Sequence, residues 1–117
     1  MRIRSYRALR PQPDLAGQIA SVPYDVVNTA ECRALVEGNP LSMLRVARAD
    51  LEFPDATDPH SDAVYARAKE NFQKLIAGGQ LVREAGPSLY IYQQQMGAHI
   101  QTGVAALCHV DDYDNNL

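Results

Sequence analysis

One stretch decides the fold class: residues 88–110 read SLYIYQQQMGAHIQTGVAALCHV. Alternate positions of its first half form two sets of side chains: Leu89, Ile91 and Gln93, and Tyr90, Tyr92 and Gln94. Side chains of a strand alternate between two faces in this way. Gly97 stands between the two halves, where a turn can use its freedom to adopt positive φ. The stretch therefore predicts a β-hairpin whose return strand runs to Val110.

A strong helix signal over residues 61–77 precedes the hairpin. Its apolar residues recur at helical spacing: Val64, Tyr65, Ala68, Phe72, Leu75 and Ile76. Asp58 or Ser61 can cap its start, and two glycines at 78–79 end it. Small residues in the return strand, among them Gly103, predict that this helix packs over the hairpin. We expect the two elements to form the core.

A second helix is predicted over residues 29–37, because Asn28 and Glu31 have the spacing of a capping box. The segment 38–40, Gly-Asn-Pro, ends it. Residues 41–47 are predicted as a strand, residues 48–60 as an irregular loop, and residues 2–8 and 80–83 as short strands. The predicted class is α+β: a mixed or antiparallel sheet of four to five strands with two main helices, ending in a C-terminal β-hairpin.

Composition places the chain among ordinary globular proteins. It has 117 residues, of which 46% are hydrophobic and 21% charged, with a net charge of −3; this length predicts a single domain. The negative charge argues against a nucleic-acid-binding face. The chain has no signal-peptide pattern and no apolar run of membrane-spanning length, so we expect a cytoplasmic protein without a membrane partner.

The segment 22–28, Val-Pro-Tyr-Asp-Val-Val-Asn, has the best claim to chemistry. Tyr24 and Asp25 lie in a turn set by Pro23, next to apolar residues and a helix start. The carboxylate can act as a base or accept from a ligand, and the phenol can donate to a phosphate or carboxylate. The alternative is a capping aspartate and a core tyrosine.

Metal and nucleophile signals are weak. Cys32 and Cys108 are far apart in the sequence and predict free thiols in a reducing compartment. Neither CxxC nor HxxxH occurs, so we predict no metal site. The three histidines are scattered, and no nucleophile–histidine–carboxylate set follows from sequence order.

A series of short motifs, in order along the chain, resembles a known family. The motifs are Tyr6-Arg7-Ala8-Leu9-Arg10-Pro11, Val22-Pro23-Tyr24-Asp25-Val26-Val27, Gly38-Asn39-Pro40-Leu41-Ser42-Met43-Leu44, Thr57-Asp58-Pro59, Val64-Tyr65, Gln101-Thr102-Gly103 and Asp111-Asp112-Tyr113. The chain resembles the N-terminal part of the bacterial and archaeal family called domain of unknown function 1015. Val22 departs from its pattern, in which a proline is usual, and so does the turn at 98–100, which is usually more polar.

The resemblance implies a longer protein, of which residues 1–117 are an N-terminal fragment, with a distant likeness to the ParB/sulfiredoxin fold. That likeness implies a binding protein or enzyme for a nucleotide or phosphorylated small molecule, with ATP or ADP as the candidate ligands of the full-length protein. Whether it is an enzyme stays open. The alternative is a non-catalytic structural or interaction domain that self-associates as a homodimer. Polar residues at family positions are the candidate ligand-binding residues: Arg7, Arg10, Tyr24, Asp25, Asn39, Ser42, Gln101 and Thr102.

Overall fold

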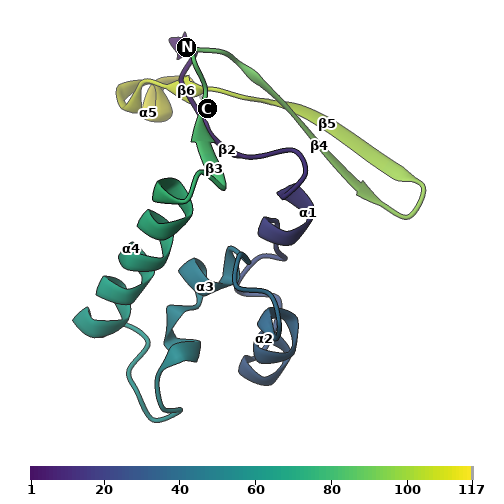
Figure 1. Cartoon of the computed structure of the whole chain (residues 1–117). Helices are drawn as coiled ribbons and strands as arrows, with labels where there is room; N and C mark the ends of the chain where they lie inside the picture. Colours follow the sequence, from purple (N-terminus) through teal and green to yellow (C-terminus); the bar gives the residue numbers. More distant parts are fainter. Residues whose placement is uncertain (117) are drawn as a thin grey trace. The chain divides into compact units, whose positions relative to one another are not determined.

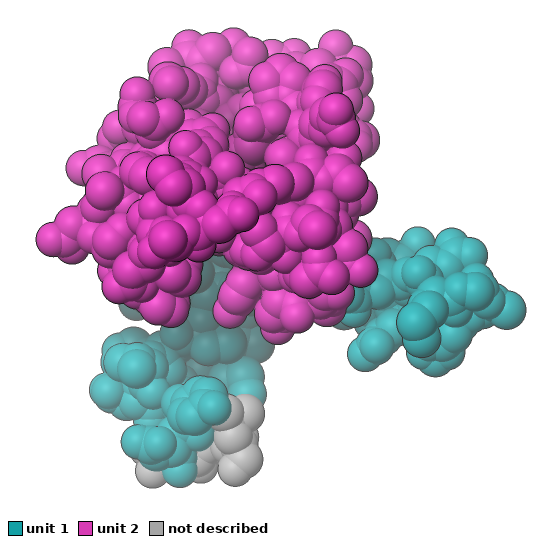
Figure 2. All heavy atoms as spheres, turned by 90° about the horizontal axis from the view of Figure 1, so that it is seen from below, with its two compact units in different colours: residues 1–10, 83–117 teal, residues 11–82 magenta. Residues whose placement is uncertain are grey.

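The computed structural model describes residues 1–116, and the side chains of residues 1–114. They form two compact units, coloured in Figure 2. The helical unit is Pro11–Val82. The strand unit combines residues 1–10 with the chain from residue 83 onward. The fold is α+β (Figure 1). None of the described helices has the length and apolar character that crossing a membrane requires.

The helical unit is built on two buried clusters of apolar side chains. Its helices are α1 (Ala16–Ile19), α2 (Thr29–Val36), α3 (Leu44–Ala47), the 3₁₀ helix η1 (Ala49–Glu52) and α4 (Asp62–Ala77). One cluster joins Ile19, Leu75 and Leu81. The other joins Cys32, Val36 and Leu44. Because Cys32 is buried and Cys108 of the strand unit is exposed, the two free thiols have different surroundings.

Helix α2 confirms its predicted capping box. The Asn28 carboxamide oxygen accepts from the Glu31 N–H at 2.9 Å, and the Glu31 carboxylate accepts from the Asn28 N–H at 2.8 Å. Two orphan donors of the first turn are satisfied in this way. The helix ends before Gly38, whose φ of 69° lies in the left-handed region that favours glycine. These local signals position α2 as the sequence predicts.

Helix α4 confirms the predicted 61–77 helix, but its cap differs from the prediction. Ser61 is the N-cap residue, yet its side chain makes no capping hydrogen bond. Its Oγ is buried with no hydrogen-bond partner among the described residues. The Asp58 carboxylate instead accepts from the His60 N–H at 2.9 Å, in the turn before the helix. Neither predicted side chain therefore caps α4.

The predicted strand over residues 41–47 is wrong, since this segment is helical. The Ser42 hydroxyl accepts from the Leu44 N–H at 3.2 Å, and α3 starts there. Leu44, only 1% exposed, belongs to one buried cluster, while Met43 and Val46 pack against the other. The segment is apolar on more than one side because it lies between two clusters. A short apolar run of this kind does not distinguish a buried strand from a buried helix.

The strands form separate pairs, and not the predicted sheet of four to five strands. Among the described residues there are three two-stranded sheets: β1 (Ile3–Arg4) with β6 (Leu107–Cys108), β2 (Leu9–Pro11) with β3 (Leu81–Arg83), and β4 (Tyr90–Met96) with β5 (His99–Ala105). An isolated bridge joins Tyr6 to Ser88. The 3₁₀ helix η2 (Val110–Asp112) and α5 (Tyr113–Asn116) follow. The return strand breaks after Ala105, and β6 pairs with β1 instead of β4.

The β4–β5 hairpin confirms the predicted turn but not the predicted core. Seven residue pairs run from Tyr90 opposite Ala105 to Met96 opposite His99, and Gly97 has a φ of 60°. Both faces of the hairpin are exposed, and within β4 and β5 only Tyr90 and Ala105 are half-buried. A Cβ atom added at Gly103 would meet nothing within 4 Å. Among the described residues of the strand unit, nothing packs closely on Gly103, and the buried clusters lie in the helical unit.

Candidate functional site

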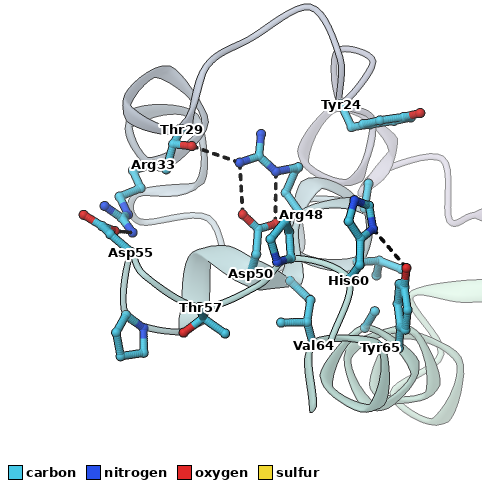
Figure 3. A pocket seen from close by; sticks show the side chains of 16 residues that line it. Tyr24, Thr29, Arg33, Arg48, Asp50, Asp55, Thr57, His60, Val64 and Tyr65 are labelled. Carbon is cyan, nitrogen blue, oxygen red and sulfur yellow. Dashed lines mark hydrogen bonds and ion pairs between the residues drawn. The ribbon is translucent and has the colours of Figure 1, made fainter. Parts of the chain in front are cut away.

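A cavity of about 760 Å³ lies in the helical unit (Figure 3). The 22–28 loop, α2, the α3–η1 segment, the 53–61 loop and the first turns of α4 all contribute to its wall. Its polar and aromatic side chains come from five places in the sequence: Tyr24, Thr29, Arg33, Arg48, Asp50, Asp55, Thr57, His60 and Tyr65. Cavities of 300–1,000 Å³ with a few convergent polar groups are typical of small-molecule sites.

The Arg48–Asp50 pair forms one wall of the cavity. Arg48 Nε and Nη2 each donate to one Asp50 carboxylate oxygen at 3.0 Å. Arg48 also reaches α2, where Nη2 donates to the Thr29 hydroxyl at 3.1 Å and Nη1 to the Cys32 sulfur at 3.5 Å. The Asp50 hydrogen bonds hold the pKa of the Arg48 guanidinium above its ordinary value. With each nitrogen engaged, Arg48 ties η1 to α2 and is a scaffold residue of the site.

The Arg33–Asp55 pair is much more open. Arg33 Nη2 donates to an Asp55 carboxylate oxygen, with the two side chains 43% and 77% exposed. The hydrogen bond from Arg33, together with its charge, holds the pKa of the Asp55 carboxyl below its usual range. An ion pair between exposed side chains contributes little stability, because water and salt screen it. A competing anion can therefore displace Asp55 from Arg33 at small cost.

Aromatic side chains line another part of the wall. His60 Nδ1 lies 3.1 Å from the Tyr65 hydroxyl, and their ring centroids are 6.5 Å apart. Tyr24 lies on the 22–28 loop and is exposed. Figure 3 shows the His60–Tyr65 pair and the Arg33–Asp55 pair on opposite sides of the cavity. A ligand with a flat ring at one end and an anionic group at the other suits this arrangement.

The candidate residues of the helical unit divide between the cavity and the scaffold. Tyr24 lines the cavity, whereas Asp25 is exposed and is not among the lining residues. The Asn39 side chain donates to the Gln18 carbonyl at 2.7 Å and accepts from the Leu41 N–H at 3.1 Å. Ser42 is buried at the start of α3. Asn39 and Ser42 therefore hold backbone geometry.

The candidate residues of the strand unit form two groups. Arg7 Nε donates to the Glu84 carbonyl at 2.7 Å, and Arg10 Nη1 contacts the Glu84 carboxylate at 3.2 Å. The Arg10 guanidinium also lies 5.7 Å from the centre of the Tyr90 ring. Gln101 and Thr102 lie on the exposed strand β5. Each of these arginines thus has a partner inside its own unit, and their roles as ligand contacts stay predictions.

Sequence reasoning missed most of the cavity. Arg33 was not singled out, and Tyr65 was assigned to the core stripe of its helix although it is exposed. Arg48, Asp50 and His60 belong to the segment 48–60, which was predicted only as an irregular loop. Long loops in compact domains are often functional, so the length of this segment is the one sequence signal for the region of the cavity. Among residues 1–114, no three His, Cys, Asp or Glu side chains gather in a way that could hold a metal ion.

Comparison with known families gives one match. Residues 3–117 match a family described as "protein of unknown function (DUF1015)". The chain belongs to the DUF1015 family. This confirms the family resemblance of its motifs, whereas the likeness of DUF1015 to the ParB/sulfiredoxin fold stays a prediction, as does the longer protein. Comparisons with curated proteins and with solved structures found no match.

Proposed function

We propose that this DUF1015 chain binds a nucleotide or another phosphorylated small molecule in the cavity of the helical unit. One observation carries the proposal: a loosely paired guanidinium and a group of aromatic rings face the same cavity of about 760 Å³. Guanidinium groups match phosphate oxygens in geometry and charge. Aromatic rings offer flat apolar surface to a base or similar ring.

Arg33 is the phosphate-binding residue in this proposal. Among the described residues, only its Nη2 has a partner, the Asp55 carboxylate, while a guanidinium carries five N–H donors. Arg48 is unsuited to the role because Asp50, Thr29 and Cys32 already engage its nitrogens. A phosphate at Arg33 replaces one exposed carboxylate contact with two or more charge-assisted hydrogen bonds.

The ring-binding side is formed by Tyr24, His60 and Tyr65. Tyr24 extends from the 22–28 loop, whereas His60 and Tyr65 are held to each other by their hydrogen bond. The cavity contains two arginines and two aspartates, so its own charge is close to balanced. A ligand with one phosphate group is therefore better matched than a highly charged one, and within the ATP and ADP pair we expect ADP to bind more tightly.

The test is calorimetric titration of the folded chain with ATP, ADP, serine and phosphoserine. The variant Arg33→Gln removes the proposed phosphate contact, and we expect at least tenfold weaker binding. Arg67→Gln is the matched control, because Arg67 is also 43% exposed, belongs to the same unit and does not line the cavity. Asp55→Asn removes the competing carboxylate and should tighten binding severalfold.

Three results would contradict the proposal. The first is an absence of binding by every phosphorylated ligand at millimolar concentration in a chain shown to be folded. The second is equal loss of affinity in the Arg33→Gln and Arg67→Gln variants, which would indicate a general charge effect. The third is binding that both Arg33→Gln and Asp55→Asn leave unchanged, which would place the ligand elsewhere on the chain.

A further inference from the structure

The hairpin of the strand unit has an open edge at β5. Among the described residues, β5 pairs with β4 and with no other strand. Figure 1 shows the hairpin extending beyond the other elements of its unit. A single two-stranded hairpin is at best marginally stable in water. The hairpin runs for seven residue pairs, so a third strand along its open edge would add stability to it.

The register fixes which backbone groups are open. The loop has two residues, with Gly97 first at positive φ, so the flanking pair of Met96 and His99 exchanges backbone hydrogen bonds. Hydrogen-bonded and non-hydrogen-bonded pairs then alternate along the ladder. The N–H and C=O groups of Ile100, Thr102 and Val104 consequently point away from β4. All three are β-branched residues, which favour strands.

This edge lacks the usual protection against strand pairing. Natural edge strands are commonly blocked by charged side chains, prolines or bulges. Residues 88–110 contain no Asp, Glu, Lys, Arg or Pro. The seven pairs of the ladder follow one another without a bulge. On one face of the hairpin, aliphatic side chains are also exposed, with Ile91 at 74% and Val104 directly opposite it.

We propose that β5 pairs antiparallel with β5 of a second copy of this chain. The edge carries no formal charge, so two copies meet there without like-charge repulsion, although the chain has a net charge of −3. The register that pairs all of His99–Ala105 places Thr102 on the two-fold axis, opposite itself. This isologous contact joins two hairpins into a four-stranded antiparallel sheet, a common size.

The proposed contact is small, which sets the concentration at which it forms. Seven residues of strand span about 24 Å at ~3.4 Å per residue. One strand edge of this length buries far less than the ~800 Å² per partner of a stable interface. The dimer is therefore weak and should form between about 10 μM and 1 mM, the range in which association must be measured.

The first experiment is analytical ultracentrifugation of the chain over this range, with two proline variants. Thr102→Pro removes an outward N–H of β5, and we expect at least tenfold weaker dimerisation. Gln93→Pro is the matched control: it removes an outward N–H of β4, and both variants lose the Gln93–Thr102 side-chain hydrogen bond of 3.2 Å. A monomer at all concentrations overturns the proposal. Equal loss in both variants also overturns it, because β5 would then have no special role.

The second experiment does not depend on a proline being tolerated. Thr102→Cys in a Cys108→Ser background places two thiols across the proposed axis, where paired Cα atoms lie about 5.5 Å apart. A disulfide accepts this separation. We expect a disulfide-linked dimer on mild oxidation, and a Gln95→Cys control on β4 that stays uncrosslinked. A failure of Thr102→Cys to crosslink under conditions that dimerise the chain overturns the proposed register.

Discussion

Helices α2 and α4 begin with different kinds of N-cap, and we predict opposite responses to the same truncation. Asn28 accepts from the Glu31 N–H and belongs to a complete capping box. Ser61 occupies the same position in α4, but its Oγ is buried without a hydrogen-bond partner among the described residues. Both helices belong to the helical unit, so the two substitutions report on the same unfolding event.

The magnitudes follow from what each side chain does. Asn28→Ala removes the cap hydrogen bond and should lower the free energy of unfolding by about 1 kcal/mol. Ser61→Ala removes a hydroxyl that folding takes out of water without compensation, and leaving such a group unsatisfied costs about 1–3 kcal/mol. The smaller alanine leaves a slight packing defect. We therefore expect Ser61→Ala to be neutral or to stabilise by up to ~1 kcal/mol.

The assay is urea denaturation of the full chain, followed by far-ultraviolet circular dichroism, with a comparison of midpoints at equal slopes. Measuring the two variants side by side avoids errors of extrapolation, because the prediction concerns only the direction in which each substitution shifts the urea midpoint. If Ser61→Ala lowers stability by about as much as Asn28→Ala, the reasoning is refuted, and the serine hydroxyl must have a partner that stabilises α4.

Three more predictions concern packing, pH and a half-buried phenol. Leu44→Ala opens a cavity in a fully buried cluster and should lower the free energy of unfolding by about 2–5 kcal/mol in the same assay. Hydrogen bonds from the Arg2 side chain and backbone hold the pKa of the Asp112 carboxyl below its usual range. The stabilisation from these hydrogen bonds is complete above the pKa that Asp112 has in the unfolded chain, and it is lost as pH falls through the lower pKa of the folded chain. Asp112→Asn should therefore make the free energy of unfolding fall less steeply with pH below about pH 4. Tyr90→Phe leaves the half-buried Ala8 N–H without its 3.0 Å acceptor and should destabilise the strand unit by about 0.5–1.5 kcal/mol, measured as faster amide exchange there.

Local signals in the sequence predicted local structure well. The capping box of α2 and the glycine turn of the hairpin depend on residues a few positions apart, so their outcome does not depend on the rest of the chain. The segment 41–47 was predicted wrongly because its apolar side chains serve two clusters. The hairpin was expected in the core because its side chains alternate as those of buried strands do. This alternation gives no information about what covers either face.

The candidate site was harder to predict for the same reason. Tyr24 could be singled out as a candidate because Pro23 marks its loop in the sequence. Arg33 and Asp55 are 22 residues apart and become partners only when η1 and its following loop bring the chain back to α2. His60 and Tyr65 are near in sequence, but helical spacing made Tyr65 look like a core residue. Contacts that form only in the tertiary structure cannot be predicted from local sequence patterns.

In the sequence, the two segments of the strand unit precede and follow the helical unit, and this order has a consequence for synthesis on the ribosome. The helical unit is continuous in sequence and can fold as soon as residue 82 has emerged. Strand β1 must wait for β6, since Ile3 pairs with Cys108. At about 5–20 residues per second, the ribosome needs roughly 5–20 s to make the intervening chain. During that time β1 has no native partner, so the strand unit completes its folding only after the helical unit can already have folded.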